Sequence, residues 1–322
     1  MEKSVESRVP FRLETLYKYG LYIVFFIMIT GLSILTPKFY SPENIKHIFL
    51  YSAPLGIGVI GVTFVIVTQG YDLSTGMVMF LSAVNSAIMI NNGYSFFFVV
   101  LVSVVCGILA GCVNGLLVAK FKVVPFIATL ATMTAGRGFT LILSKQQTLY
   151  INNNVGDFIV KTRILGIPFI VYLLLVLAII GQIVLTRTGY GRQLYAIGNH
   201  AVAARKIGIK VTLTTFSVYL ISGACAALAG LISALQVGAV TPTLGDGTQF
   251  VITSAAVLGG VSLFGGRGNI LPGALTGVLM FTIIENGLIL MNANPYAYTI
   301  VRGLVIFLAV AVDCIRNTLE LK

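Results

Sequence analysis

Long apolar segments separated by short polar ones make up almost the whole chain. A bilayer core of about 30 Å requires roughly 20 apolar residues in each helix. The pattern predicts eight spans of about this length: Gly20–Leu35, Leu50–Val67, Phe97–Val118, Val123–Leu143, Ile167–Leu185, Leu213–Val237, Ile270–Leu290 and Tyr298–Cys314. Two further apolar segments, Leu73–Ile90 and Phe250–Leu263, are shorter and flanked by glycines. We therefore expect an all-α integral membrane protein with about ten transmembrane helices in the lipid bilayer.

The composition agrees with a membrane protein. Of the 322 residues, 57% are hydrophobic and only 10% are charged, which is too few charges to cover a soluble protein of this size. The formal net charge is +11. The basic residues lie between apolar spans and form no aromatic-basic surface, so we expect no nucleic-acid partner.

The distribution of basic residues predicts the orientation. With the N-terminus inside, most lysines and arginines fall in inner segments, and the outer segments hold only Lys38, Lys46, Lys145, Lys161 and Arg163. Cytoplasmic loops are enriched in these residues, so we expect both termini in the cytoplasm. The chain then divides into a cytoplasmic N-terminal segment 1–19, a transmembrane domain 20–316 and a cytoplasmic tail 317–322.

The most organised polar stretch lies between the sixth and seventh spans, at about residues 187–212. It carries five basic residues and no acidic one: Arg187, Arg192, Arg205, Lys206 and Lys210. Glycine-rich turns surround a patch of alanine and arginine, which favour helix. We expect this loop to be a docking surface for a cytosolic partner, in which Ala203, Ala204 and Arg205 form a contact helix.

Short motifs recur in the same order in the two halves of the chain. They are Asp72, Asn114-Gly115-Leu116 and Arg137-Gly138 in the first half, and Asp246, Asn286-Gly287-Leu288 and Arg302-Gly303 in the second. Corresponding motifs lie five spans apart, which gives the halves opposite topology, although Arg302 fits this less well than the others. The pattern predicts an inverted repeat of two five-span halves. The two short spans are then third in each half, where interrupted helices line a transport path.

Several polar residues within the spans have both a structural and a functional interpretation. Asp72 would cap the helix that follows it or present a polar group at a cavity mouth. Arg137, Glu285 and Arg302 lie at membrane depth, where each costs about 2.5–3.5 kcal/mol without a partner or water. They would form a buried structural cluster or line an outer vestibule. The sequence leaves these alternatives open.

Asn114 lies beside a ridge of small residues, Gly107-x3-Gly111-x3-Gly115. Such ridges allow close packing of membrane helices, and we expect that role for the glycines. The amide of Asn114 requires a hydrogen-bond partner within the bundle.

Motifs for catalysis or cofactor binding are not found in the sequence. There is no GxxxxGK[ST] phosphate loop, and the two histidines and four cysteines have no spacing typical of a metal site or disulfide framework. The glycine-rich stretch from Gly259 to Gly268 is better explained as a tight inner turn. We expect no enzyme activity and no cofactor bound by this chain.

Six motifs in order give the chain a resemblance to a known family. They are Asp72-Leu-Ser-Thr-Gly76, Gly111-Cys-Val-Asn-Gly-Leu-Leu-Val118, Pro125-Phe-Ile-Ala-Thr-Leu130 with Arg137-Gly138, Thr188-Gly-Tyr-Gly-Arg-Gln-Leu-Tyr-Ala-Ile-Gly198 with Ala203-Ala204 and Gly208-Ile209, Gly259-Gly260-Val-Ser-Leu-Phe-Gly265-Gly266, and Asn286-Gly-Leu288. In these motifs the chain resembles, over nearly its whole length, the permease subunits of ribose-type ABC sugar importers, in the superfamily shared with branched-chain amino-acid permeases.

The resemblance implies a permease in the cytoplasmic (inner) membrane of a prokaryote. Its implied partners are cytosolic ABC ATPase subunits that bind ATP and Mg, an extracytoplasmic solute-binding protein, and a second permease subunit, either identical or a paralogue. The coupling residues would be Gly191, Arg192, Ala203, Ala204, Arg205 and Gly208. The translocation path or gate would include Asp72, Asn114, Arg137, Gln249, Glu285, Asn286 and Arg302. The solute is expected to be a small hydroxylated compound such as a sugar.

Two stretches depart from the family pattern. Family members often carry Glu-Leu-Asp where this chain has Gln249-Phe250-Val251, so two acidic groups are missing from the outer vestibule. The coupling loop usually reads Gly-Gly-Asn, whereas this chain has Gly198-Asn199-His200-Ala201-Val202. These changes put in doubt the solute and the ATPase partner, not the class.

An ion- or proton-coupled secondary transporter with inverted repeats is the alternative. It would explain Asp72, Glu285 and the two halves, but not the concentration of organised polar residues in one inner loop. An intramembrane enzyme lacks a nucleophile–base pair or a metal-binding constellation.

Overall fold

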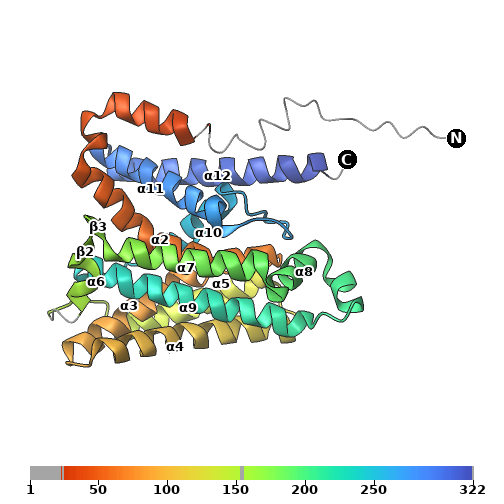
Figure 1. The fold of residues 1–322 in the computed structure, drawn as a ribbon. Coiled ribbons are helices and arrows are strands. Elements are labelled where there is room, and N and C mark those ends of the chain that lie inside the picture. Colours follow the sequence, from red (N-terminus) through yellow and green to blue (C-terminus); the bar gives the residue numbers. More distant parts are fainter. Residues whose placement is uncertain (1–22, 24, 153–155, 321–322) are drawn as a thin grey trace.

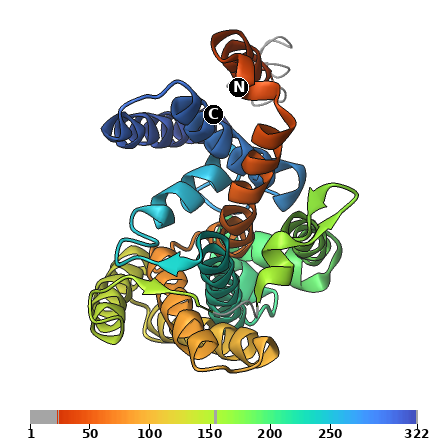
Figure 2. The same cartoon turned by 90° about the vertical axis from the view of Figure 1, so that its left-hand side faces the viewer.

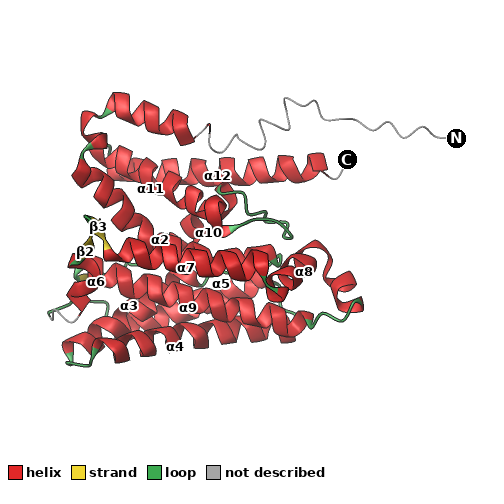
Figure 3. Cartoon of the chain, viewed as in Figure 1, coloured by secondary structure: helices red, strands yellow, loops and turns green. Residues whose placement is uncertain are grey.

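The computed structural model describes residue 23, residues 25–152 and residues 156–320 of the chain. Helices form most of it, and the strands are two-residue pieces in connecting loops (Figure 3). Seven helical segments in the described part are long and apolar enough to cross a membrane. They are α2 (Pro42–Val67), α4 (Phe96–Gly115) with its π-helical extension η2 (Leu116–Lys120), α5 (Pro125–Leu143), α7 (Phe169–Arg187), α9 (Val211–Val237), η4 (Ile270–Ala274) with α11 (Leu275–Leu290), and α12 (Pro295–Glu320).

Three shorter apolar helices complete the set: Phe25–Leu35, α3 (Thr75–Asn91) and α10 (Thr248–Leu258). Every expected span therefore coincides with an apolar helix, although the beginning of the first one lies outside the described residues. The protein is a multi-pass, all-α membrane protein. The two spans that we expected to be short are α3 and α10.

The connecting segments hold the remaining elements. They are η1 (Pro37–Tyr40), β1 (Leu149–Tyr150), α6 (Asp157–Lys161), β2 (Arg163–Ile164), β3 (Ile167–Pro168), α8 (Gly189–Lys206) and β4 (Ala239–Val240). Strand β1 pairs antiparallel with β4, with Leu149 opposite Val240, and β2 pairs antiparallel with β3. The β2–β3 hairpin and α8 lie at opposite ends of the bundle (Figure 1).

Local sequence signals explain where several helices begin and end. Ser41 accepts a hydrogen bond from the backbone N–H of Asn44, and Pro42 occupies the first position of α2, both of which favour helix initiation. Helix α9 ends at Gly238, whose φ of +72° is the left-handed conformation of a glycine C-cap.

Helix α9 lies at the centre of the fold, where α2, α3 and α4 pack against it (Figure 2). The glycine ridge of α4 makes the closest approach. A Cβ on Gly107 would lie 2.2 Å from the carbonyl oxygen of Gly223, and a Cβ on Gly111 would lie 2.2 Å from that of Tyr219. The structure thus confirms the packing role predicted for this ridge.

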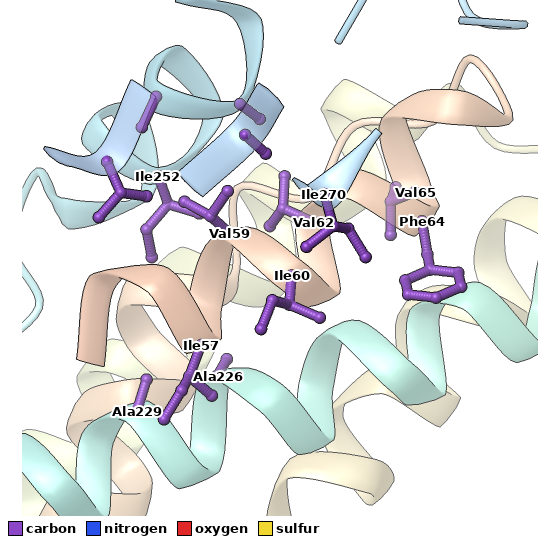
Figure 4. Close-up of a cluster of buried hydrophobic side chains, with 14 of the residues drawn as sticks. Ile57, Val59, Ile60, Val62, Phe64, Val65, Ala226, Ala229, Ile252 and Ile270 are labelled. Atoms are coloured by element: carbon purple, nitrogen blue, oxygen red, sulfur yellow. The ribbon is translucent and has the colours of Figure 1, made fainter. Parts of the chain in front are cut away.

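The hydrophobic core surrounds α2, which is buried along most of its length. Ile57 and Ile60 on α2 lie beside Ala226 and Ala229 of α9, and Ile252 of α10 approaches α2 from the other side (Figure 4). The outer helices expose large apolar side chains instead, as membrane-facing helices do. Helix α2 therefore joins the centre of the bundle to the C-terminal helices α10 and α11.

Candidate functional site

Two interrupted helices meet inside the bundle. The chain is non-helical between Val67, where α2 ends, and Thr75, where α3 begins, and again between β4 and the start of α10 at Thr248. A Cβ on Gly76 would lie 2.3 Å from the carbonyl oxygen of Gly245, and a Cβ on Gly245 would lie 2.1 Å from that of Gly76. Gly245 also has a φ of +77°, which L side chains rarely adopt. Only glycine fits on either side of this contact.

A buried hydrogen-bond network holds the first interruption in place. The Asp72 carboxyl accepts from the backbone N–H of Ser74 at 3.0 Å, from the Ser74 hydroxyl at 2.6 Å and from the Ser222 hydroxyl at 2.6 Å. The Asn114 amide donates to the Ser74 hydroxyl at 2.8 Å and accepts from Thr132 at 2.6 Å. The network therefore links the start of α3 with α4, α5 and α9.

This network favours the structural interpretation of Asp72. The side chain is only 3% exposed, and it faces neighbouring hydroxyls rather than a cavity mouth. The Asp72 carboxyl accepts from the N–H of Ser74, as a residue at the start of a helix does. It also accepts a hydrogen bond from Ser222 on α9. Asp72 and Asn114 therefore make their hydrogen bonds within the bundle, and neither lines the cavity described next.

Beside the meeting point of the two interrupted helices is a cavity of about 320 Å³. It is lined by residues of α3, α5, α10 and the loop before α10: Met77, Met133, Thr134, Arg137, Gly138, Leu141, Gly245, Asp246 and Gln249. Its floor is buried, because Met77 and Gln249 are each 5% exposed, whereas the Asp246 side chain is 68% exposed at the mouth.

Arg137 reaches across this cavity from α5 to the loop before α10. Its guanidinium donates to the carbonyl oxygen of Pro242 at 2.9 Å and lies 3.6 Å from the Asp246 carboxylate. It also lies 5.5 Å from the centre of the Phe80 ring, within cation–π range. Arg137 therefore has three partners, and its charge is balanced at the cavity mouth.

The other ionisable pair lies apart from the cavity. Arg302 of α12 donates to Glu285 of α11, and both side chains are about one-third exposed. Arg137, Glu285 and Arg302 do not form the single buried cluster considered as one alternative, because Asp246 supplies the acid for Arg137. Arg302 still borders the start of α10, since its guanidinium lies 3.8 Å from the Cβ position of Gly247.

Asn286 pairs with Asn44 of α2 through two reciprocal amide hydrogen bonds of 2.9 and 2.7 Å. Both asparagines of the repeated Asn-Gly-Leu motif thus satisfy their amides within the bundle. Neither of them lines the cavity. Gln249 and Arg137 are the two expected path residues that do.

At the end of the bundle opposite the β2–β3 hairpin, α8 projects from the ends of α7 and α9 (Figure 1). The Thr188 hydroxyl caps its start by accepting from Gly191, and His200 interrupts it with extended backbone angles of −161° and 94°. The imidazole Nδ1 of His200 accepts from the backbone N–H of Ala203 at 3.2 Å. His200 is therefore the N-cap of a second helical piece, residues 201–206, which the predicted contact helix occupies.

The first part of α8 is tied to the rest of the molecule. Tyr195 donates to the carbonyl oxygen of Gly268 at 2.7 Å, and burial raises the pKa of its phenol, which keeps it a donor. A Cβ on Gly198 would lie 1.9 Å from the carbonyl oxygen of Val67, which accepts from the N–H of Gly266. The glycine-rich 259–268 stretch is the predicted turn, and it bridges α8 and the end of α2.

The second part of α8 exposes an apolar and basic tip. Val202 and Ile207 are 62% and 75% exposed, and Arg205 is exposed with them. Ala204 differs, because it is 2% exposed and packs with Ile197 and Val211. The residues expected to touch a partner therefore separate into an exposed set with Ala203 and Arg205, and a buried set with Ala204 and Gly191.

Sequence reasoning missed several residues that the structure brings to these places. In the sequence, Asp246 stood out only as a member of the repeated motifs, yet it is the acid paired with Arg137. Thr132 and Ser222 are ordinary small polar residues in apolar helices, and no local signal marks them. Asp313 near the end of α12 accepts from the backbone N–H of Leu263 at 2.8 Å; its position within an apolar helix was the available signal.

Comparisons with known proteins agree with this architecture. Residues 44–310 match the family described as branched-chain amino acid transport system / permease component. The ribose import permease protein RbsC of Bacillus subtilis is 38% identical over 92% of each chain. The L-arabinose transport system permease protein AraH of Escherichia coli is 33% identical over 92% of this chain and 90% of its own. The D-allose transport system permease protein AlsC of Escherichia coli is 32% identical over 97% of each. No solved structure matches.

Proposed function

The chain belongs to the family of branched-chain amino acid transport system permease components, and we propose that it is the permease subunit of an ATP-driven importer for a small sugar. The observation that carries the proposal is α8, a helix broken at His200 whose exposed tip bears Arg205 and Lys206. Such a tip, held rigidly at one end of a membrane bundle, suits docking on a cytosolic ATPase. No phosphate-binding loop occurs in the chain, so ATP and Mg would be bound by that partner.

The sugar assignment comes from the relatives. The three compared above are named for ribose, L-arabinose and D-allose. Each is covered along at least nine-tenths of its length, so the likeness includes the helices around the cavity. We assign a monosaccharide as the solute, delivered by an extracytoplasmic solute-binding protein and passed along a permease made of two such subunits.

The packing supports an inverted repeat with ten spans. Helices α3 and α4 of the first half pack on α9 of the second, whereas α10 and α11 of the second half pack on α2 of the first. Likewise α3 contacts α5, and α10 contacts α12. If α2 corresponds to α9, α3 to α10 and α4 to α11, each contact in one half has its counterpart in the other. Two halves related by a pseudo-two-fold axis would produce this pattern.

The orientation follows from the position of α8. Helix α12 ends on the same side of the bundle as α8 (Figure 1). If the basic α8 lies in the cytoplasm, the described end of the chain is cytoplasmic as well. We propose an inner membrane of a bacterium as the location, with the β2–β3 hairpin facing outward.

Cells that lack their own uptake system for the sugar provide the test. Together with its solute-binding protein, the chain is expressed without an ATPase subunit, with its ATPase subunit, and with an ATPase subunit whose catalytic glutamate is replaced. Accumulation should require the intact ATPase. Accumulation without an ATPase subunit, abolished by an ionophore, would instead establish the secondary transporter.

A further inference from the structure

The cavity between α3, α5 and α10 has one polar side chain on its floor, and the hydrogen bond that this side chain makes to the protein is weak. This side chain is Gln249, which lines the cavity and is only 5% exposed. Within the described residues, its amide nitrogen donates a hydrogen bond to the sulfur of Met133, at 3.5 Å. A thioether is a weak acceptor. A buried amide normally finds stronger partners, so this one is available to a molecule in the cavity.

The rest of the lining is apolar below and charge-balanced above. Met77 and Met133 line it with flexible thioether side chains, which can adapt their shape to an apolar surface. At the mouth, the Arg137 guanidinium and the Asp246 carboxylate lie 3.6 Å apart. Their charges cancel, so a charged solute would find no uncompensated counter-charge there and would lose its hydration.

The two ionisable groups at the mouth argue against a cavity that faces lipid. Ionisable side chains at membrane depth face the bundle interior or water because exposure to hydrocarbon is costly. Arg137 and Asp246 are 23% and 68% exposed. The side of α5 that carries Thr134 and Gly138 is therefore turned toward water or toward protein.

We infer that this cavity is a subsite for one neutral, polyhydroxylated molecule of monosaccharide size, and that the amide of Gln249 hydrogen-bonds a ring hydroxyl. The assignment rests on the proposed function. A volume of about 320 Å³ lies at the lower end of small-molecule sites, which fits one sugar ring and not two. The methionines contact the C–H face of the ring, and the groups at the mouth contact its hydroxyls.

The chain offers a matched pair of variants for the cavity itself. Gly138 lines the cavity and Gly303 does not, yet both are exposed helical glycines whose Cβ would meet nothing within 4 Å. Gly138→Leu fills the cavity, and Gly303→Leu adds the same side chain at the equivalent position of the other half. In proteoliposomes holding the complete transporter, uptake of radiolabelled ribose, L-arabinose or D-allose should fall at least tenfold in Gly138→Leu. It should stay within twofold of wild type in Gly303→Leu.

Gln249→Met tests the amide, because methionine has a similar volume and matches the neighbouring side chains. At a sugar concentration that saturates the binding protein, the maximal uptake rate should fall at least fivefold while the half-saturating concentration stays the same. Co-purification of the variant with the ATPase subunit shows that it folds and assembles. If it does not co-purify, Gln249→Leu, which also removes both hydrogen-bonding atoms of the amide, is measured instead, with the same loss expected.

The outcomes separate the two proposals. Normal uptake by wild type together with unaffected rates in Gly138→Leu and in the Gln249 variants would overturn the subsite and leave the proposed function intact. Absence of uptake of all three sugars by the wild-type complex would overturn the proposed function and the subsite with it.

Discussion

Gly76 and Gly245 touch through their backbones at the point where the two interrupted helices meet. Each would place a Cβ within 2.3 Å of the other's carbonyl oxygen, a distance that no side chain permits. Gly76 lies in the first turn of α3, and Gly245 lies just before α10. The contact holds the start of α3 against the loop before α10, and Gly245 also lines the cavity.

Replacing Gly76 with alanine is expected to destabilise the protein by about 1–3 kcal/mol, the usual range for overpacking of a close-packed interior. The overlap is with backbone, which cannot move aside as a flexible side chain does. Thermal unfolding of the purified protein in detergent measures the loss. Gly303→Ala is the control, because its Cβ would meet open space. Equal stability of the two variants would contradict the contact.

Replacing Asp72 with alanine is expected to lower stability by about 1.5–3 kcal/mol, since it removes the acceptor of three hydrogen bonds at a buried site. Ser222→Ala should lose only about 1 kcal/mol, because the carboxyl retains both donors from Ser74. The same unfolding measurement distinguishes them. A larger loss in Ser222→Ala than in Asp72→Ala would show that the network is not centred on the carboxyl.

Most helix ends could be predicted from the sequence to within about three residues, because apolar windows of membrane length identify them without any tertiary information. The start of α2 at Pro42 and the end of α12 at Glu320 lie well outside the predicted spans, because polar residues there continue the helix beyond its apolar part. The contacts within the site could not be predicted. The Asp72 network joins residues of α3, α4, α5 and α9, and small polar residues such as Thr132 and Ser222 have no pattern that marks them. Arg137 was recognised as an intramembrane charge, but the choice between Asp246 and Glu285 as its partner depends on how the helices pack.

The inner loop illustrates the same limit. Its basic residues predicted a docking surface, and its alanines predicted a helix. The burial of Ala204 was not predicted, because the helix is broken at His200 and helical periodicity does not extend across the break. The departure from the family pattern at His200 has a structural role as the cap of the contact helix.

Replacing His200 with alanine is expected to loosen the contact helix by about 1 kcal/mol through loss of its N-cap. Sugar uptake by the assembled transporter should fall by about fivefold, the factor that corresponds to this energy. His200→Asn should restore uptake, since asparagine is a favourable N-cap. Equal uptake by the alanine and asparagine variants would exclude a capping role.

Replacing Ala203 with glutamate should weaken association with the ATPase subunit, because it places an acid on the exposed tip beside Arg205. Membrane insertion and thermal stability should not change. Co-purification with the ATPase subunit measures the association. Ala204→Glu serves as the contrasting variant, since burial of an acid beside Ile197 and Val211 should reduce stability as well. Full association of Ala203→Glu would remove the tip from the interface.

The most direct test of the account is the energy source of transport. Proteoliposomes are prepared with this chain, its ABC ATPase subunit and its solute-binding protein, and uptake of radiolabelled ribose, L-arabinose and D-allose is measured. We expect accumulation of at least one of these sugars that requires ATP on the α8 side and persists when ionophores abolish ion gradients. Accumulation that is driven by an ion gradient without ATP, and that collapses with the ionophore, would contradict it.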